Sequence, residues 1–151
     1  MRYLDDFAAG QVFDLGVKTV TAEEIVRFAK DFDPQPFHLD EAAGKRTHFG
    51  GLVASGWQTA GFLMRLLVDA VLRESASLGS PGVDEVRWLK PVRPGDTLCG
   101  RLECLGVEPS RSKPDRGIAR FVYELWNQGG ECVFRMKGMG LFARKPGAAA
   151  P

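Results

Sequence analysis

The spacing of hydrophobic residues predicts that the first half of the chain is mainly helical. Between Ile25 and Phe32, apolar residues recur at intervals of three and four, which is the period of a helix with one inward face. Thr21 and Glu24 precede this run at the spacing of a capping box, so we place the helix start there. We expect the helix to end at Asp33-Pro34, because a proline disfavours helical geometry in the residue before it.

A second, longer helix is predicted from Ser55 to about Ser75. Its apolar residues, beginning with Trp57, cover most of the helical circumference, a pattern typical of a helix that is buried on nearly every side. Gln58, Arg65 and Asp69 interrupt this segment. A membrane-spanning helix needs about twenty mostly apolar residues. We therefore expect this helix in the core of a soluble domain, with no membrane contact.

The remaining segments carry the alternating pattern and turn signals of β-strands. Pro94-Gly95 fits the centre of a type II turn, and residues 127–130 (Asn-Gln-Gly-Gly) fit a hairpin turn. The expected strands cover residues 12–20, 83–89, 98–106, 118–126 and 132–142. One antiparallel sheet wrapped around one long helix satisfies this order, so the predicted class is α+β. We expect a single domain over residues 1–145, followed by a Gly-, Ala- and Pro-rich disordered tail over residues 146–151.

Composition narrows the classes of partner and the compartment. The chain has 151 residues, with 20 Lys and Arg against 19 Asp and Glu, so no overall field favours nucleic acid or an anionic membrane. Three cysteines without Cys-x-x-Cys spacing argue against a disulfide framework or structural zinc. Acidic residues near the start, Asp5 and Asp6, do not fit a secretory leader. We expect a cytoplasmic protein.

A short proline-stiffened loop carries the most reactive side chains of the chain. In Asp33-Pro34-Gln35-Pro36-Phe37-His38, the two prolines hold the backbone extended between a carboxylate and an imidazole. Ser55-Gly56 follows at the start of the long helix, where unpaired backbone amides favour negative charge. An acid, a base and a helix N-terminus in one pocket indicate a reaction site.

Three segments resemble the MaoC-like dehydratases, a family that includes the R-specific enoyl-CoA hydratases of the hotdog fold. The loop from Asp33 to His38 matches the Asp, Pro and His of the family's Asp-x-Asn-Pro-x-His motif. Gly56 matches a glycine at the start of the hotdog helix, and residues 90–96 (Lys-Pro-Val-Arg-Pro-Gly-Asp) are similar to a turn between sheet strands. Gln35 replaces the motif's Asn, and Ser55 replaces a histidine that commonly precedes the glycine.

The resemblance implies reversible hydration of a 2-enoyl thioester, carried by CoA or acyl carrier protein, to the (R)-3-hydroxyacyl thioester. Asp33 and His38 would activate water and protonate C2, and the Gly56 amide would stabilise the enolate. Gln35, Ser55 and Trp57 are expected to contact the substrate, with Ser55 also capping the helix and Trp57 narrowing the acyl pocket. No metal or organic cofactor is implied. The family further implies a homodimer or higher homo-oligomer with sites near the subunit boundary. The large strand residues Trp88, Trp126 and Phe134 could contribute to such a contact, or could simply pack in the core.

Structural explanations compete with each of these roles. Asp33 could simply end a helix, His38 could be a hydrogen-bonded core histidine, and Gly56 could permit close packing. Arg87, Lys90 and Arg93 could meet CoA phosphates, although exposed charges usually form a solvated face. These three residues lie in or beside the expected strands and turn.

Three other functions remain open from the residues. His38, Asp40 and His48 have the composition of a two-histidine, one-carboxylate iron site. A hotdog thioesterase would place a carboxylate on the central helix, where the chain offers only Asp69. A non-catalytic acyl-CoA-binding module would need neither Asp33 nor His38, so the presence of both counts against it.

Overall fold

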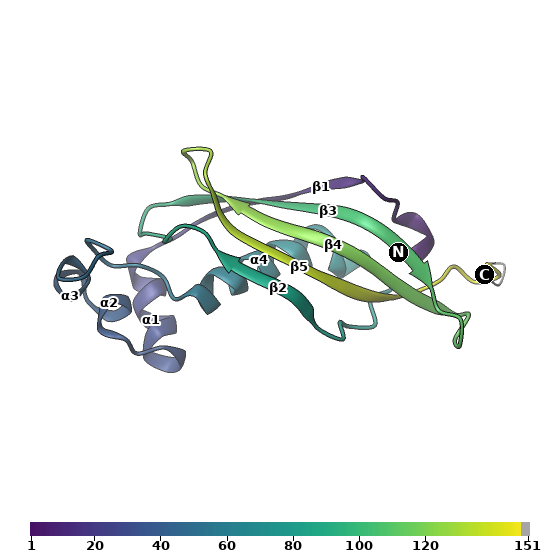
Figure 1. Ribbon diagram of the computed structural model, residues 1–151, viewed down its shortest axis with the longest axis horizontal. Coiled ribbons are helices and arrows are strands. Elements are labelled where there is room, and N and C mark those ends of the chain that lie inside the picture. Colours follow the sequence, from purple (N-terminus) through teal and green to yellow (C-terminus); the bar gives the residue numbers. More distant parts are fainter. Residues whose placement is uncertain (149–151) are drawn as a thin grey trace.

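Five antiparallel strands form one curved sheet in the computed structural model, which describes residues 1–148 (Figure 1). The strands lie in the order β1-β3-β4-β5-β2, so β1 and β2 form the two edges. Their bounds are β1 Val12–Thr19, β2 Val83–Trp88, β3 Thr97–Pro109, β4 Arg116–Trp126 and β5 Cys132–Ala143. The five strands confirm the segments that the alternating pattern predicts.

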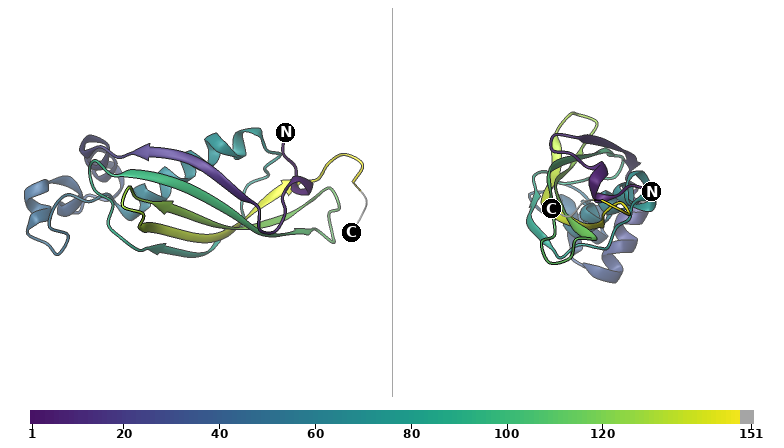
Figure 2. Two further views of the ribbon diagram at one scale, coloured as in Figure 1. Left: turned by 90° about the horizontal axis from the view of Figure 1, so that it is seen from above. Right: turned by 90° about the vertical axis from the view of Figure 1, so that its right-hand side faces the viewer.

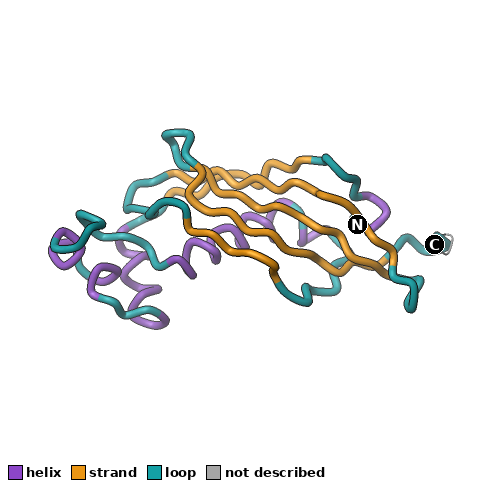
Figure 3. The backbone as a smooth tube through the Cα atoms, in the orientation of Figure 1, coloured by secondary structure: helices purple, strands orange, loops and turns teal. Residues whose placement is uncertain are grey.

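The helices fall into two groups (Figure 3). Three short helices gather at one end of the sheet, and one longer helix, α4, lies along its inner face. Their bounds are α1 Ala22–Phe32, α2 Pro36–Leu39, α3 Glu41–Lys45 and α4 Gly56–Ala70, with 3-10 turns at Leu4–Asp6 and Leu72–Glu74. A single antiparallel sheet around one central helix is the hotdog fold, as the sequence predicts.

Helix α4 is buried on one side only, and the expectation of burial on nearly every side is wrong. Leu63, Leu66 and Leu67 pack into the core against the sheet, and the helix lies closest to β1 (Figure 2). Trp57 and Met64, on the opposite side, are 64% and 48% exposed. None of the helices among the described residues is long and apolar enough to cross a membrane.

The close approach of α4 to the sheet depends on a glycine in β3. A Cβ built on Gly100 would lie 2.9 Å from Leu15 Cβ and 3.1 Å from Leu66 Cδ1, closer than packed carbon atoms tolerate. The absence of a side chain therefore lets a β1 residue and an α4 residue meet over β3. This contact sets how closely the C-terminal half of α4 packs on the sheet.

Helix α1 begins where the sequence predicts, but the side chain of its last residue, Phe32, is unexpectedly exposed. Thr21 accepts a hydrogen bond from the Glu24 amide, and Glu24 accepts one from the Thr21 amide, which confirms the capping box. Ile25 and Ala29 are buried, but Phe32 is 74% exposed. The inward face therefore stops one turn earlier than the periodicity indicates, because the last turn of α1 extends beyond the core.

The predicted turns are present, and the predicted tail is only partly described. Asp96 N donates to Arg93 O across the Pro94-Gly95 turn, and Gly130 N donates to Asn127 O in the hairpin between β4 and β5. Residues 146–148 form a turn, in which Ala148 N donates to Lys145 O. Residues 149–151 lie outside the described residues, so the disordered tail stays a prediction.

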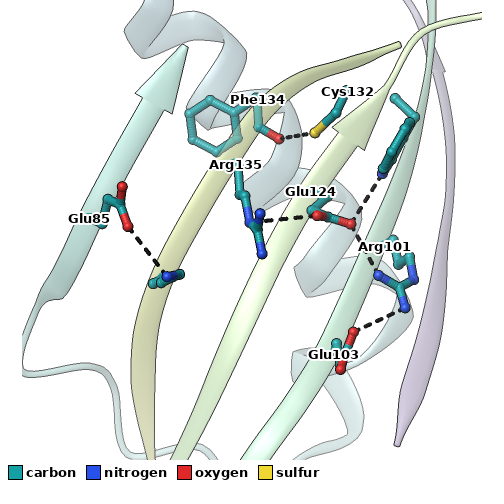
Figure 4. Close-up of polar contacts among 9 residues, drawn as sticks. Glu85, Arg101, Glu103, Glu124, Cys132, Phe134 and Arg135 are labelled. Carbon is teal, nitrogen blue, oxygen red and sulfur yellow. Dashed lines mark hydrogen bonds and ion pairs between the residues drawn. The ribbon is translucent and has the colours of Figure 1, made fainter. Parts of the chain in front are cut away.

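The face of the sheet turned away from α4 carries a network of ion pairs (Figure 4). Glu124 in β4 is nearly buried and accepts hydrogen bonds from Arg101 in β3, at 3.1 Å, and from the Trp126 indole, at 3.2 Å. Arg135 in β5 lies 3.6 Å from the same carboxylate. One side chain thereby links the three central strands on their outer surface.

Candidate active site

Asp33 and His38 lie together at the end of the molecule where α1, α2 and the start of α4 meet (Figure 1). Asp33 is the residue after α1 and leaves helical geometry, with φ −152° and ψ 69°. Pro36 then starts α2, a single turn that carries His38 back toward the carboxylate. His38 Nε2 lies 3.3 Å from Asp33 Oδ2, so the short loop brings the predicted pair together.

The orientation of the His38 ring is fixed by a backbone carbonyl. His38 Nδ1 lies 2.7 Å from Val53 O, and a carbonyl can only accept, so the proton of the neutral ring resides on Nδ1. Nε2 is then the basic nitrogen, and it faces Asp33. Because the imidazole is buried, this arrangement holds one proton acceptor at a defined position.

Two donors hold the Asp33 carboxylate. Gln35 Nε2 donates to Oδ1 at 2.8 Å and Ser55 Oγ donates to Oδ2 at 2.7 Å. Partial burial by itself would raise the pKa of Asp33, but the hydrogen bonds from Gln35 and Ser55 and the neighbouring His38 together lower that pKa below its ordinary value. The carboxylate is therefore ionised at neutral pH.

Ser55 does not cap α4 with its side chain, so that prediction is wrong. It occupies the N-cap position, but its hydroxyl makes no capping hydrogen bond and donates to Asp33 instead. The side chain is fully buried. The Ser55 hydroxyl is therefore placed to hold the Asp33 carboxylate.

Gly56 presents an unpaired amide at the first position of α4. Among the described residues its N–H makes no hydrogen bond, as is usual for the first turn of a helix. Its carbonyl accepts from Trp88 Nε1 at 2.7 Å. A Cβ at Gly56 would lie 2.6 Å from that nitrogen, so glycine is needed for the indole of β2 to rest on the helix start.

A cleft of about 440 Å³ joins these groups. Asp33, Gln35, His38 and Gly56 line it, together with Trp57, which stands at its mouth. Aromatic and apolar side chains complete the wall: Phe37, Phe49, Val53, Trp88, Leu89, Pro91 and Val92. The cleft therefore offers a carboxylate, an imidazole and a backbone donor to one bound molecule of mainly apolar surface.

The iron-site interpretation does not fit the geometry. Among residues 1–148, no group of three or more His, Cys, Asp or Glu side chains is placed to hold a metal ion. Asp40 accepts a hydrogen bond from Ala43 N and caps α3, and the His48 ring packs against Phe49. The three side chains therefore make separate contacts and do not converge on one metal site.

The other candidate charges lie away from the reacting groups. Asp69 pairs with Arg65 and Arg73 on the exposed side of α4, near its C-terminal end, so it does not serve the cleft. Arg87 pairs with Glu85. Lys90 alone of the three proposed phosphate ligands lines the cleft, and its ammonium lies 3.4 Å from Glu131.

Two contributors to the site are absent from the sequence prediction. Val53 acts through its carbonyl, and a backbone group leaves no signal in residue type. Trp88 is predicted as a strand residue and a candidate for the subunit contact, yet it lines the cleft and donates a hydrogen bond to Gly56. The one signal in the sequence is the alternation of side chains along a strand, which places Trp88 and Val86 together on the face that packs against the core.

The chain is similar to one family model and to several known proteins. Residues 6–122 match the family model of the MaoC-like domain. A solved structure, a MaoC-like dehydratase from Rhodospirillum rubrum, is 42% identical, with a TM-score of 0.87 over 97% of this chain and 99% of that chain. The uncharacterized protein YdeM of Bacillus subtilis is 33% identical over 83% of this chain and 87% of its own. The (R)-specific enoyl-CoA hydratase of Rhodospirillum rubrum is 30% identical over 74% of this chain and 75% of its own.

Proposed function

The chain belongs to the MaoC-like dehydratase domain family, and we propose that it reversibly hydrates a 2-enoyl-CoA thioester to the (R)-3-hydroxyacyl thioester. The observation that carries this proposal is the position of Asp33 Oδ2 and His38 Nε2, 3.3 Å apart, in the cleft that also contains the unpaired Gly56 amide. The similarity to an enzyme named as an (R)-specific enoyl-CoA hydratase supports the same reaction.

Water would be activated between the carboxylate and the imidazole. The ionised Asp33 accepts one hydrogen bond from the water, and the basic Nε2 of His38 accepts the other. As the water oxygen bonds to C3, one proton passes to this pair. The pair then delivers a proton to C2, so that one water is added across the double bond and the two side chains return to their starting states.

The negative charge that develops on the thioester oxygen needs a donor. The Gly56 amide is unpaired, lines the cleft and stands at the positive end of the α4 dipole. An amide fixed at a helix start does not reorganise when the enolate forms. This is why a backbone donor can stabilise the transition state more than it stabilises the bound substrate.

Gln35, Ser55 and Trp57 take supporting roles in this proposal. Gln35 and Ser55 hold the two oxygens of Asp33, so they set the direction in which the carboxylate meets water. Trp57 stands at the mouth of the cleft and is placed to contact the thioester or its acyl group. All the catalytic groups named here are side chains and backbone amides, and the mechanism draws on no cofactor.

We also propose that the protein is a homodimer. Strand β2 is a free edge of the sheet, and an exposed apolar stripe runs beside it, formed by Trp57 and Met64 of α4 with Val83 and Trp88 of β2. Edge strands are normally covered or paired. A second copy that pairs with β2 would cover the stripe and place the boundary between the subunits next to the cleft.

Incubation with trans-2-butenoyl-CoA tests the reaction. We expect the absorbance of the conjugated thioester to fall while 3-hydroxybutyryl-CoA forms in equal amount, without release of free CoA thiol and without loss of rate after dialysis against a chelator. Release of thiol would indicate a thioesterase. Tight binding of acyl-CoA without any conversion, over a series of chain lengths, would indicate a non-catalytic binding module.

A further inference from the structure

A second cavity lies along α4, beyond the cleft. It has a volume of about 310 Å³ and lies between the C-terminal half of the helix and the inner face of the sheet. Its wall is mainly apolar, with Met64 and Leu67 from α4, Val71 directly after the helix, and Val83, Tyr123 and Met136 from the strands. The proposed mechanism does not use this cavity.

An apolar strip joins the cleft to the second cavity. On β2, the inward side chains follow in the order Trp88, Val86 and Val83, from the cleft to the cavity. On α4, Ala60 lies between the two, and Ala60 and Val86 are both partly buried against the core. At about 1.5 Å per residue, Gly56 and Met64 are separated by about 12 Å along the helix, which is within the reach of a medium-length acyl chain.

The ring of Trp88 stands at the cleft end of this strip. Its indole nitrogen bonds the Gly56 carbonyl at 2.7 Å, which ties the β2 side chain to α4. Trp57 meets the ring edge-on at a centroid distance of 5.1 Å, and Phe134 meets it at 6.2 Å from the side of the sheet. The indole is therefore held from three sides, between the start of α4 and the sheet.

We propose that Trp88 is a specificity-determining residue that closes the strip and limits the substrate to short acyl groups, and that the second cavity is an acyl-tail site which becomes reachable when the indole is removed. The inference rests on the proposed hydratase function. The fixed hydrogen bond to Gly56 is central, because a freely rotating tryptophan would swing aside for a longer chain, whereas this one loses a hydrogen bond and two ring contacts when it moves.

The test is the dependence of kcat/KM on acyl length, measured with trans-2-butenoyl-, hexenoyl- and octenoyl-CoA. The wild-type protein should prefer the butenoyl ester. In Trp88→Ala, the ratio of octenoyl to butenoyl kcat/KM should rise by roughly tenfold or more, since each buried methylene is worth about fourfold in binding. Val86→Phe, added to Trp88→Ala, should return the ratio toward the wild-type value by refilling the strip.

Trp126→Ala is the matched control, because Trp126 lies on β4 at the outer-face network and does not line the cleft. It should leave the ratio unchanged. Circular dichroism identifies any variant that is not folded, and Trp88→Val then replaces Trp88→Ala. A folded Trp88 variant with an unchanged ratio, or a wild-type protein that prefers octenoyl-CoA, would overturn the inference.

Calorimetric binding of saturated butyryl- and octanoyl-CoA separates this inference from the proposed function. Saturated esters cannot be hydrated, so their binding does not depend on turnover. If the wild-type protein hydrated none of the enoyl esters, the proposed function would fail, while tighter octanoyl-CoA binding by Trp88→Ala would still support the tail site. Equal octanoyl-CoA affinity of wild type and variant would count against it.

Discussion

The charge of Asp33 depends on the two side chains that donate to it. With these donors in place, the folded-state pKa lies below the ordinary value of 3.8, so the active, ionised form persists until the pH falls below that value. In Ser55→Ala or Gln35→Leu, the pKa should rise and the acid limb of kcat/KM should move to higher pH. We also expect kcat to fall by about tenfold, as the loss of a hydrogen bond to a charged group predicts.

The pH profile separates this positioning role from a merely structural one. A variant that is only less stable would lose activity without a displaced acid limb. Ser55→Thr keeps the hydroxyl and serves as the conservative comparison. An acid limb that stays in place in both Ser55→Ala and Gln35→Leu would contradict the assignment of these residues to Asp33.

At this scale the sequence predicts the reactive side chains better than their surroundings. The spacing of Asp33 and His38 around two prolines is local, and the structure brings the two side chains together. The expected extended backbone between them is wrong beyond Gln35, because Pro36 starts the helical turn α2. The partners of these residues are not local: Ser55 and Val53 reach them from a segment about twenty residues further along. Such contacts depend on how the chain returns to the loop, which periodicity does not encode.

Among the elements, the outer face of the sheet offers a direct test of stability. Glu124 is buried and meets Arg101 and Arg135, so Glu124→Gln should lower the free energy of unfolding by about 1–2 kcal/mol, because Arg135 loses its carboxylate partner and Arg101 keeps only Glu103, while both arginines remain half-exposed to water. Glu85→Gln is the control. Its ion pairs with Arg87 and Lys137 are exposed, so its substitution should change the free energy of unfolding much less than Glu124→Gln does. Urea unfolding of both variants gives the comparison, and equal effects would refute the role of Glu124.

The element boundaries were predictable where the signals are local. The Thr21 and Glu24 capping box and the hairpin after β4 appear as expected, since each rests on contacts within a few residues. The extent to which α4 is buried was not predictable in this way. Its apolar residues surround the helix, but the sheet covers only one side, and the sequence pattern does not say which side that will be.

For the whole molecule, the exposed stripe beside β2 predicts the way in which two copies associate. Light scattering at low micromolar concentration should give about twice the chain mass of 16.6 kDa. Met64→Lys or Val83→Lys should produce a monomer with reduced activity, because a charge would be buried at the boundary. Val17→Lys, on the opposite edge strand β1, should remain a dimer. A fully active wild-type monomer would contradict both the dimer and its role at the site.

One of the large strand residues that the sequence suggests for this contact is not available. Phe134 is completely buried in the core, whereas Trp88 is 44% exposed beside the edge and Trp126 lies on the outer face. Size alone could not distinguish these three. Their roles follow from strand order and from the face on which each side chain stands, and both are properties of the assembled sheet.

The central claim, that Asp33 and His38 carry out hydration, is tested most directly by kcat/KM for trans-2-butenoyl-CoA in three variants. Asp33→Asn and His38→Ala should each lose on the order of a hundred- to ten-thousand-fold, with unchanged circular dichroism and unchanged mass in solution. Asp69→Asn, which changes an exposed carboxylate near the far end of α4, should keep the wild-type value. A folded Asp33→Asn or His38→Ala protein that hydrated the ester at the wild-type rate would contradict the account.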